Sequence, residues 1–143
     1  MKIANIQSEA IWSLMKIIPF SLIKRIGSCQ LIIPYYHVVN NEDVPHISHL
    51  YKYKNTRQFC DDLNFLLTHY TPIGLSDLIS WRRGKNILPP NCFLLTFDDG
   101  FREIYDVIAP ILLDKGIPAT FFIPSAFLDN RELCYQHKAS LLA

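Results

Sequence analysis

The sequence predicts an α/β fold built around one buried strand. Residues Phe93–Phe97 are apolar apart from Thr96, with Pro89-Pro90 before them and Gly100 after them. A short apolar run with such limits is typical of a strand that is buried on both faces. Segments with strand character also alternate along the chain with segments of helical periodicity. That alternation favours an α/β arrangement, in which the chemistry lies at the carboxyl ends of the strands.

The composition allows one globular core and excludes some classes of partner. The chain has 143 residues, of which 50% are hydrophobic, and its net charge is +1. So small a positive charge does not fit a nucleic-acid-binding domain. The cysteines lie far apart without a C-x-x-C pair, which predicts reduced thiols rather than disulfides or a zinc knuckle. They are Cys29, Cys60, Cys92 and Cys134.

The first part of the chain, residues 1–29, forms a segment of its own before a domain at 30–143. Apolar residues recur at helical spacing over 1–27, which predicts an amphipathic helix. Glu9 and Lys16 interrupt the apolar core that a signal peptide would need, and no small-residue cleavage site follows. The helix either packs on the domain or makes peripheral contact with a membrane. A cytoplasmic or membrane-peripheral location is therefore favoured over secretion.

The first predicted strand covers Leu31–Tyr36 and is followed directly by His37. A lone histidine at a strand end is more often a structural group than a catalyst. The polar loop after it contains His46 and His49, whose H-x-x-H spacing is also found in metal sites. Without further ligands on the loop, this pair is a weak metal candidate.

Asn55 or Thr56 is predicted to cap a helix that runs to about Tyr70. Asp61 and Asp62 favour the N-terminal half of this helix and are interpreted as structural. The apolar stripe of the helix consists of Phe59, Leu63, Leu66 and Leu67.

Thr71–Ile73 is predicted to be a short extended segment. Ser76 is then predicted to cap a second helix, which Gly84 closes. Arg82 and Arg83 lie at the C-terminal end of this helix, where positive charge complements the helix dipole.

The helix that follows the central strand contains Pro110, which either kinks it or begins a new helix. Gly116 is the expected end of that helix, and Ile117–Ile123 is the next buried strand. After it, the sequence predicts a loop over 124–130 and a helix from Arg131 onward.

Two adjacent carboxylates, Asp98 and Asp99, stand at the end of the central strand, and Gly100 allows a sharp turn behind them. Neighbouring negative charges repel, so a proton or a cation is expected to compensate one of them. In one interpretation, one aspartate binds a divalent metal ion while the other remains free as a base. In the other, one of the pair caps the following helix.

The residues around this pair identify a family resemblance. The segments Thr96–Gly100 (TFDDG) and Gly116–Ile123 (GIPATFFI), together with Tyr36-His37 after the first strand, resemble the polysaccharide deacetylase (NodB-homology) family. The resemblance extends over roughly Leu31–Leu128.

The resemblance implies metal-dependent hydrolysis of N-acetyl groups on an acetylated glycan or polysaccharide in a bacterium. By the family's pattern Asp99 matches a metal ligand and Asp98 the general base, and His37 lines the substrate pocket. Zinc is the divalent ion most expected, because it suits catalytic sites that activate water.

The family's second group of metal ligands, an H-[ST]-x-x-x-H-like motif, has no counterpart in this sequence. His137 is the one histidine after Asp99, and it stands in a helical stretch without a partner histidine. Catalytic zinc usually has three protein ligands, so metal binding by this chain alone is expected to be weak or absent.

The family fold is a distorted (β/α) barrel, and barrels of this type take roughly 250 residues. The domain at 30–143 contains about four strand candidates by their apolar pattern, which predicts a partial barrel that is not closed and is truncated at its C-terminal end. Such a chain would be inactive alone. The alternatives are a non-catalytic half-barrel that binds a glycan or a partner, and a peripheral membrane protein led by residues 1–27. No oligomeric state follows from the sequence.

Overall fold

A computed structural model of the chain describes residues 30–143. Within it, Leu31–Ala143 forms one compact unit. The helix predicted over residues 1–27 lies outside the described residues. No helix in the described part of the chain has the length and apolar character needed to cross a membrane.

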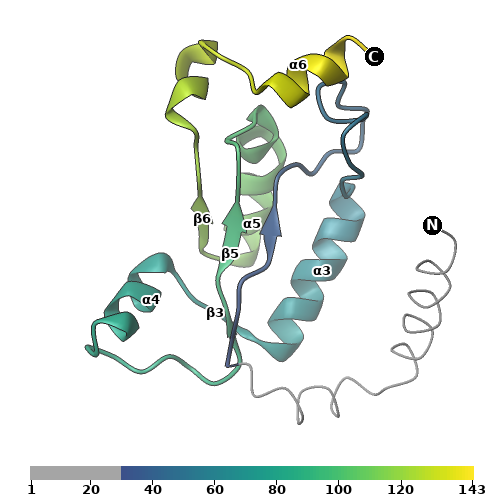
Figure 1. Cartoon of the computed structure of the whole chain (residues 1–143). Coiled ribbons are helices and arrows are strands. Elements are labelled where there is room, and N and C mark those ends of the chain that lie inside the picture. The colour runs from purple at the N-terminus through teal and green to yellow at the C-terminus, as the bar shows by residue number, and fades with distance from the viewer. Residues whose placement is uncertain (1–29) are drawn as a thin grey trace, which may run out of the picture. The chain divides into compact units, whose positions relative to one another are not determined.

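Short parallel strands form the centre of this unit (Figure 1). They form two sheets with the orders β1-β4-β3 and β2-β5-β6, and every pairing is parallel. The strands are β1 (Leu31–Ile32), β2 (Tyr35–Tyr36), β3 (Thr71–Pro72), β4 (Cys92–Phe93), β5 (Leu95–Phe97) and β6 (Ala119–Phe121). Neither sheet closes on itself, so the predicted α/β class with an unclosed parallel arrangement is confirmed.

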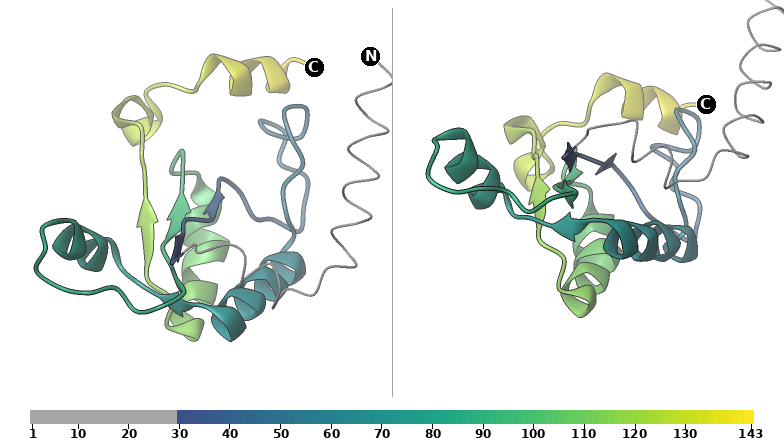
Figure 2. Two further views of the ribbon diagram at one scale, coloured as in Figure 1. Left: turned by 60° about the horizontal axis from the view of Figure 1, so that its bottom comes forward. Right: turned by 90° about the horizontal axis from the view of Figure 1, so that it is seen from below.

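The central strands are buried on both faces, as their unbroken apolar run predicts. Phe93, Leu95 and Phe97 belong to a core cluster that includes residues of the helices α3 (Thr56–His69) and α5 (Ala109–Lys115). Their neighbours alternate to the other face, where Cys92 and Leu94 pack with Leu78 of α4 (Leu75–Arg82). Figure 2 shows α3 and α5 close to the strands and α4 set apart from them.

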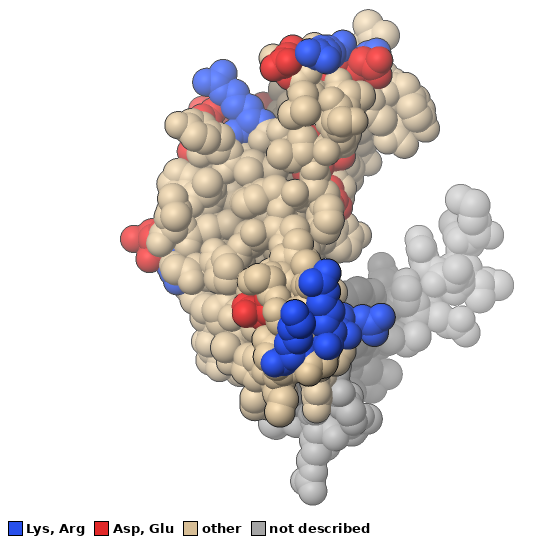
Figure 3. Space-filling view, turned by 90° about the vertical axis from the view of Figure 1, so that its left-hand side faces the viewer, with Lys and Arg blue, Asp and Glu red and all other residues tan. Residues whose placement is uncertain are grey.

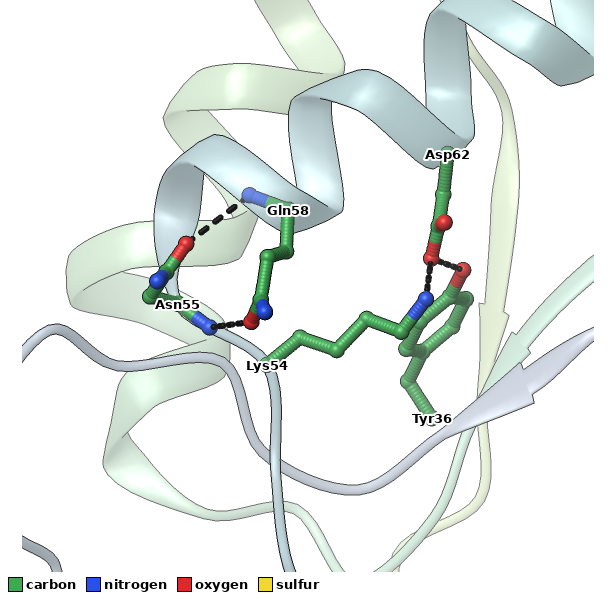
Figure 4. A network of polar contacts seen from close by, with 5 residues as sticks. All are labelled: Tyr36, Lys54, Asn55, Gln58 and Asp62. Atoms are coloured by element: carbon green, nitrogen blue, oxygen red, sulfur yellow. Dashed lines mark hydrogen bonds and ion pairs between the residues drawn. The ribbon is translucent and has the colours of Figure 1, made fainter.

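Helix α3 begins as predicted from Asn55. The Asn55 side chain accepts a hydrogen bond from the Gln58 N–H at 2.8 Å, and the Gln58 side chain accepts one from the Asn55 N–H at 3.1 Å (Figure 4). This reciprocal pair satisfies amide donors that the first helical turn leaves open. The prediction that Leu67 belongs to the buried apolar stripe of this helix is wrong. Its side chain is 39% exposed, whereas the other predicted members of the stripe are buried.

Asp62 in the middle of α3 has the structural role that the sequence predicts. Its carboxylate accepts a hydrogen bond from the Tyr36 hydroxyl at 2.7 Å and forms an ion pair with the Lys54 ammonium group (Figure 4). Burial, followed by this hydrogen bond and the Asp62 charge, raises the pKa of Tyr36 well above its usual value. The contact joins the end of β2 to α3.

Helix α4 begins two residues earlier than predicted. Gly74 rather than Ser76 is the N-cap, because the Asp77 carboxylate accepts the Gly74 N–H at 2.9 Å and so stabilises an earlier start. Ser76 therefore lies inside the first turn. Gly84 closes the helix as predicted, with a φ of 68° in the left-handed region.

The helix after the central strand accommodates Pro110 without a break. A π-helical segment, η1 (Ile104–Ile108), leads directly into α5, and Pro110 lies in the first turn of α5. In a regular α-helix the proline ring clashes with the carbonyl four residues earlier, and the wider π-turn before Pro110 gives the ring more room. Gly116 ends α5 with a φ of 64°.

The C-terminal region differs from the prediction. Residues Ser125–Asn130, predicted as a loop, form a 3₁₀ segment, η2, and helix α6 covers Tyr135–Leu141 rather than starting at Arg131. Asp129 and Asn130 have φ values of 58° and 54°, and this left-handed backbone interrupts the helical path.

The described cysteines are thiols. Cys92 is fully buried, and Cys60 and Cys134 are partly buried. Burial raises the pKa of the Cys92 thiol, which is typical of a structural rather than a reactive cysteine.

Candidate functional site

The predicted site residues stand at the carboxyl ends of two paired strands. β2 and β5 are parallel with Tyr36 opposite Phe97, so the next residues, His37 and Asp98, leave the sheet side by side. The Asp98 N–H donates to the Tyr36 carbonyl at 3.0 Å and extends this pairing by one step. The sheet therefore positions His37 and the acidic pair at one edge, where α/β folds usually carry their sites.

The three side chains meet at this edge. His37 Nε2 lies 3.9 Å from Asp98 Oδ2 and 4.0 Å from Asp99 Oδ2. The side chains are 31%, 38% and 25% exposed in the order His37, Asp98 and Asp99, so all three are within reach of solvent. Within residues 30–143, neither carboxylate accepts a hydrogen bond from the helix that follows, so capping does not explain the pair.

A tight turn holds the acidic pair in place. Asp99 and Gly100 both have a φ of 71°, in the left-handed region that most side chains resist. The Gly100 N–H donates to the Asp98 carbonyl at 3.0 Å across this turn. A Cβ atom at Gly100 would lie 3.0 Å from both Cγ atoms of Ile123. Glycine at 100 is thus required by backbone geometry and by the close approach of Ile123.

Gly100→Ala is expected to lower the free energy of unfolding by about 2–4 kcal/mol, through left-handed strain and overpacking together. Gly84→Ala is the matched control, because Gly84 has a φ of 68° and no atom within 4 Å of its Cβ position. It is expected to cost only about 1–2 kcal/mol. Urea unfolding followed by circular dichroism measures both. Equal losses for the two variants would show that Ile123 imposes no constraint on the turn.

A cleft of about 550 Å³ opens beside the acidic pair. It lies between the end of β2, the loop after it and the C-terminal region. Its lining includes His37, Tyr51, Asp99, Phe127, Gln136 and His137. An adjoining hollow of about 390 Å³ is lined by His37, Asp98 and Asp99 with residues that follow β6. The cleft and the hollow give a ligand access to both carboxylates.

Tyr51 lies in the cleft close to the acidic pair. Its ring centroid is 5.5 Å from that of His37. Burial, and secondly the negative charge of Asp99, raise the pKa of Tyr51 to about 12. The phenol is therefore a neutral hydrogen-bonding group at physiological pH.

His137 is a cleft residue that the sequence did not reveal. It is 4% exposed, and its ring centroid lies 5.1 Å from that of Phe101 and 6.0 Å from that of His46. Its Nδ1 atom is buried and has no hydrogen-bond partner among the described residues. Burial lowers the pKa of His137, the nearby Asp99 charge opposes this shift, and the proximity of His46 and His37 adds to it.

The sequence shows His137 only as a lone histidine in a helical stretch, whereas the structure places it in the cleft beside Phe101 and His46. Only the order of strands along the chain could have indicated that His137 lies near Asp99. Loops that follow parallel strands meet at the same edge of a sheet, however far apart they are in the sequence. His137 lies on the segment after β6, and that segment returns over the acidic pair.

The H-x-x-H pair has separate structural contacts. His49 Nδ1 lies 3.3 Å from the Ser140 hydroxyl, which also donates to the Pro45 carbonyl at 2.8 Å. His46 instead contacts the rings of Phe101 and His137. These contacts attach the loop after β2 to α6.

The donors present do not complete a metal site. Across residues 30–143, no group of three histidine, cysteine or acidic side chains is placed to hold a metal ion. His37, Asp98 and Asp99 approach one another in pairs, but catalytic zinc usually needs three converging protein ligands. The described residues alone therefore do not fit a complete catalytic metal centre.

Comparison with known proteins identifies the relatives of this fold. The polysaccharide deacetylase family model matches residues 85–138, and no curated protein matches the sequence. A de-N-acetylase from Aggregatibacter actinomycetemcomitans is 28% identical with a TM-score of 0.59, over 70% of this chain and 39% of its own. IcaB from Ammonifex degensii is 25% identical with a TM-score of 0.56, over 66% of this chain and 38% of its own. The chain thus spans about two fifths of the length of these structures.

Proposed function

The chain belongs to the polysaccharide deacetylase family, and from this premise we propose that residues 31–143 carry the first part of a site that hydrolyses N-acetyl groups on a glycan. One observation supports the proposal above the others. His37 Nε2 lies within 4.0 Å of a carboxylate oxygen of both Asp98 and Asp99, beside an open cleft.

In this proposal, Asp98 is the general base. Its carboxylate is partly exposed at the edge of the sheet and can accept a proton from a water molecule that attacks the N-acetyl carbonyl. His37 presents Nε2 to the same space and orients the bound sugar through a hydrogen bond. Both side chains start from rigid backbone, because β2 and β5 are paired up to these residues.

Asp99 is proposed as one ligand of a divalent metal ion, with zinc most expected. The family is typically metal-dependent, which supports this role. Since the described residues contain no group of three ligands, further ligands would have to come from outside residues 30–143. The isolated chain is accordingly proposed to be inactive.

A second candidate is a half-barrel that binds a glycan without hydrolysing it. The lack of a three-ligand group in the described residues favours it. The cleft would still offer hydrogen-bonding groups to a sugar, among them Tyr51, Gln136 and His37.

A chimera separates the two candidates. Residues 31–143 replace the matching part of the Aggregatibacter de-N-acetylase, and acetate release from N-acetylglucosamine oligomers is measured. If residues 31–143 carry part of a deacetylase site, the chimera is expected to release acetate, whereas the Aggregatibacter enzyme without its matching part is not. A folded chimera that binds the oligomers and releases no acetate would instead support the binding module.

The isolated chain is expected to bind zinc with a dissociation constant weaker than about 1 μM, because an incomplete ligand set loses most of the affinity of a zinc site. Calorimetric titration of the full chain measures this value, and Asp99→Asn is expected to weaken it further. Asp61→Asn is the control, since Asp61 is an exposed carboxylate on α3. Tighter binding, or binding that Asp99→Asn leaves unchanged, would contradict the assigned ligand.

A further inference from the structure

The C-terminal end of α4 and the segment after it form an exposed run of residues 81–87, which we call the α4 tip. Every residue in this run is exposed. Helix α4 itself has no fully buried residue, and Leu78 packs against the cluster of Cys92 and Leu94. The tip accordingly projects from the strands, as Figures 1 and 2 show for α4.

The α4 tip carries positive charge alone. It contains Arg82, Arg83 and Lys85 and no acidic residue. Among the described residues, none of these cations forms an ion pair. The acid of α4, Asp77, is engaged at the other end of the helix by the Gly74 N–H. Figure 3 shows Lys and Arg side chains gathered in one cluster over the α4 region.

Two apolar side chains accompany these cations. Ile87 is 92% exposed and Trp81 is 42% exposed. Complementing the helix dipole explains a basic residue in the last turn, but it explains neither Lys85 beyond the helix nor an isoleucine left in water. Tryptophan and basic side chains together are typical of protein segments that lie in the interface of a lipid bilayer.

We propose that the α4 tip binds the surface of an anionic lipid bilayer. Arg82, Arg83 and Lys85 contact the negatively charged headgroups, while Trp81 and Ile87 enter the interfacial layer. A soluble polyanion would also attract the cations, but it would give Ile87 no apolar environment. The exposed apolar residues therefore favour a bilayer over a soluble polymer.

Binding of the α4 tip to a bilayer would leave the cleft beside the acidic pair open to a ligand. The α4 tip leads into the N-terminal end of β4, whereas His37, Asp98 and Asp99 lie at the carboxyl ends of β2 and β5. A bilayer bound at the tip would lie at the opposite end of the strands from the acidic pair. This inference goes beyond the proposed deacetylase function and does not depend on it.

The test is flotation of the full chain with vesicles of phosphatidylglycerol and phosphatidylcholine, compared with vesicles of phosphatidylcholine alone. Binding is expected with the anionic vesicles and is expected to weaken as salt rises. In the triple variant R82Q/R83Q/K85Q, the partition coefficient onto anionic vesicles is expected to fall about fivefold for each cation removed, or about a hundredfold altogether. The double variant W81S/I87S is expected to lose about tenfold or more at unchanged charge.

A matched control removes three exposed cations elsewhere, in the triple variant R57Q/R131Q/K138Q. It is expected to retain partitioning within about threefold, because charges far from the bilayer are screened. Equal losses in the two triple variants would overturn the proposal, and so would flotation of R82Q/R83Q/K85Q that equals flotation of the unmodified chain. Circular dichroism of each variant verifies that the fold is retained.

Fluorescence gives a second readout. The chain has two tryptophans, Trp12 and Trp81, so W12F leaves Trp81 as the reporter. A blue shift on addition of anionic vesicles, with reduced quenching by acrylamide, is the expected result. An unchanged emission spectrum would overturn the proposal. So would a chain that does not bind vesicles but binds soluble heparin equally well with and without W81S/I87S, because that result indicates a polymer site.

Discussion

Asp98→Asn is expected to lower acetate release from N-acetylglucosamine oligomers by about 10²- to 10⁴-fold in the chimera that carries residues 31–143. Asparagine has nearly the same shape as aspartate, but it cannot accept a proton from the attacking water. The backbone at this position is fixed by the hydrogen bond from the Asp98 N–H to the Tyr36 carbonyl, which the substitution retains. The loss should therefore appear in kcat, with little change in oligomer binding.

Asp61→Asn is the matched control for this result. Asp61 is also followed directly by a second aspartate, but it lies exposed on α3, away from the cleft. Its substitution is expected to leave turnover within about twofold, since exposed surface changes rarely affect a distant site. Turnover that persists in Asp98→Asn would rule out Asp98 as the base, even if the chimera is an active deacetylase.

The largest expected loss of stability comes from Phe97→Ala, at about 3–5 kcal/mol. Phe97 is fully buried at the end of β5. Its ring stacks with Tyr36 at 5.8 Å and with Phe121 at 5.3 Å, and it meets Phe59 edge-on at 6.1 Å between centroids. Removing the ring leaves a cavity among these aromatic side chains and removes a contact between the strands and α3. Urea unfolding followed by circular dichroism measures the change.

A milder substitution keeps this prediction testable if Phe97→Ala does not fold. Phe97→Leu retains most of the apolar volume and is expected to cost about 1–2 kcal/mol. Phe122→Ala is the control, because Phe122 follows β6 and its side chain is 55% exposed. It is expected to cost less than about 1 kcal/mol. A similar loss at both aromatic positions would contradict the central role of Phe97 in the core.

Phe97 also links stability to the candidate site. It directly precedes Asp98, and its carbonyl accepts the Phe122 N–H at 2.8 Å. The acidic pair therefore projects from a fully buried point of the sheet, where close packing restrains side-chain positions. A loosened core at Phe97 is expected to displace Asp98 and Asp99 as well.

Several features were predictable because they depend on short stretches of sequence. The apolar run at 93–97 predicts a strand buried on both faces, and the structure packs its alternate residues against different layers. The structure divides this predicted strand between β4 and β5. The Asn55 cap and the terminating glycines at 84 and 116 follow from local backbone chemistry. The partial, unclosed barrel of deacetylase type is confirmed by the open sheets and by the structural match.

Other features were wrong because they depend on contacts that sequence spacing does not encode. The choice of Gly74 over Ser76 as the cap of α4 followed from a hydrogen bond to Asp77. Leu67 has the spacing of a core residue, but the stripe that α3 presents to the strands is narrower than its apolar pattern. The start of α6 at Tyr135 depends on the left-handed backbone just before it.

The sequence by itself determined where the extended segments lie, most helix ends and the acidic pair behind the central strand, because local periodicity and turn chemistry decide these features. It did not show that Leu31–Tyr36 divides into β1 and β2, or that the strand predicted at Ile117–Ile123 is only β6 and is not fully buried. Only the tertiary structure decided which distant groups share the cleft. It brought His37, Tyr51 and His137 to Asp99 from separate parts of the chain. It also left the cations of the α4 tip unpaired among the described residues. The physical reason is that parallel strands bring their following loops to one edge, whatever their separation in sequence.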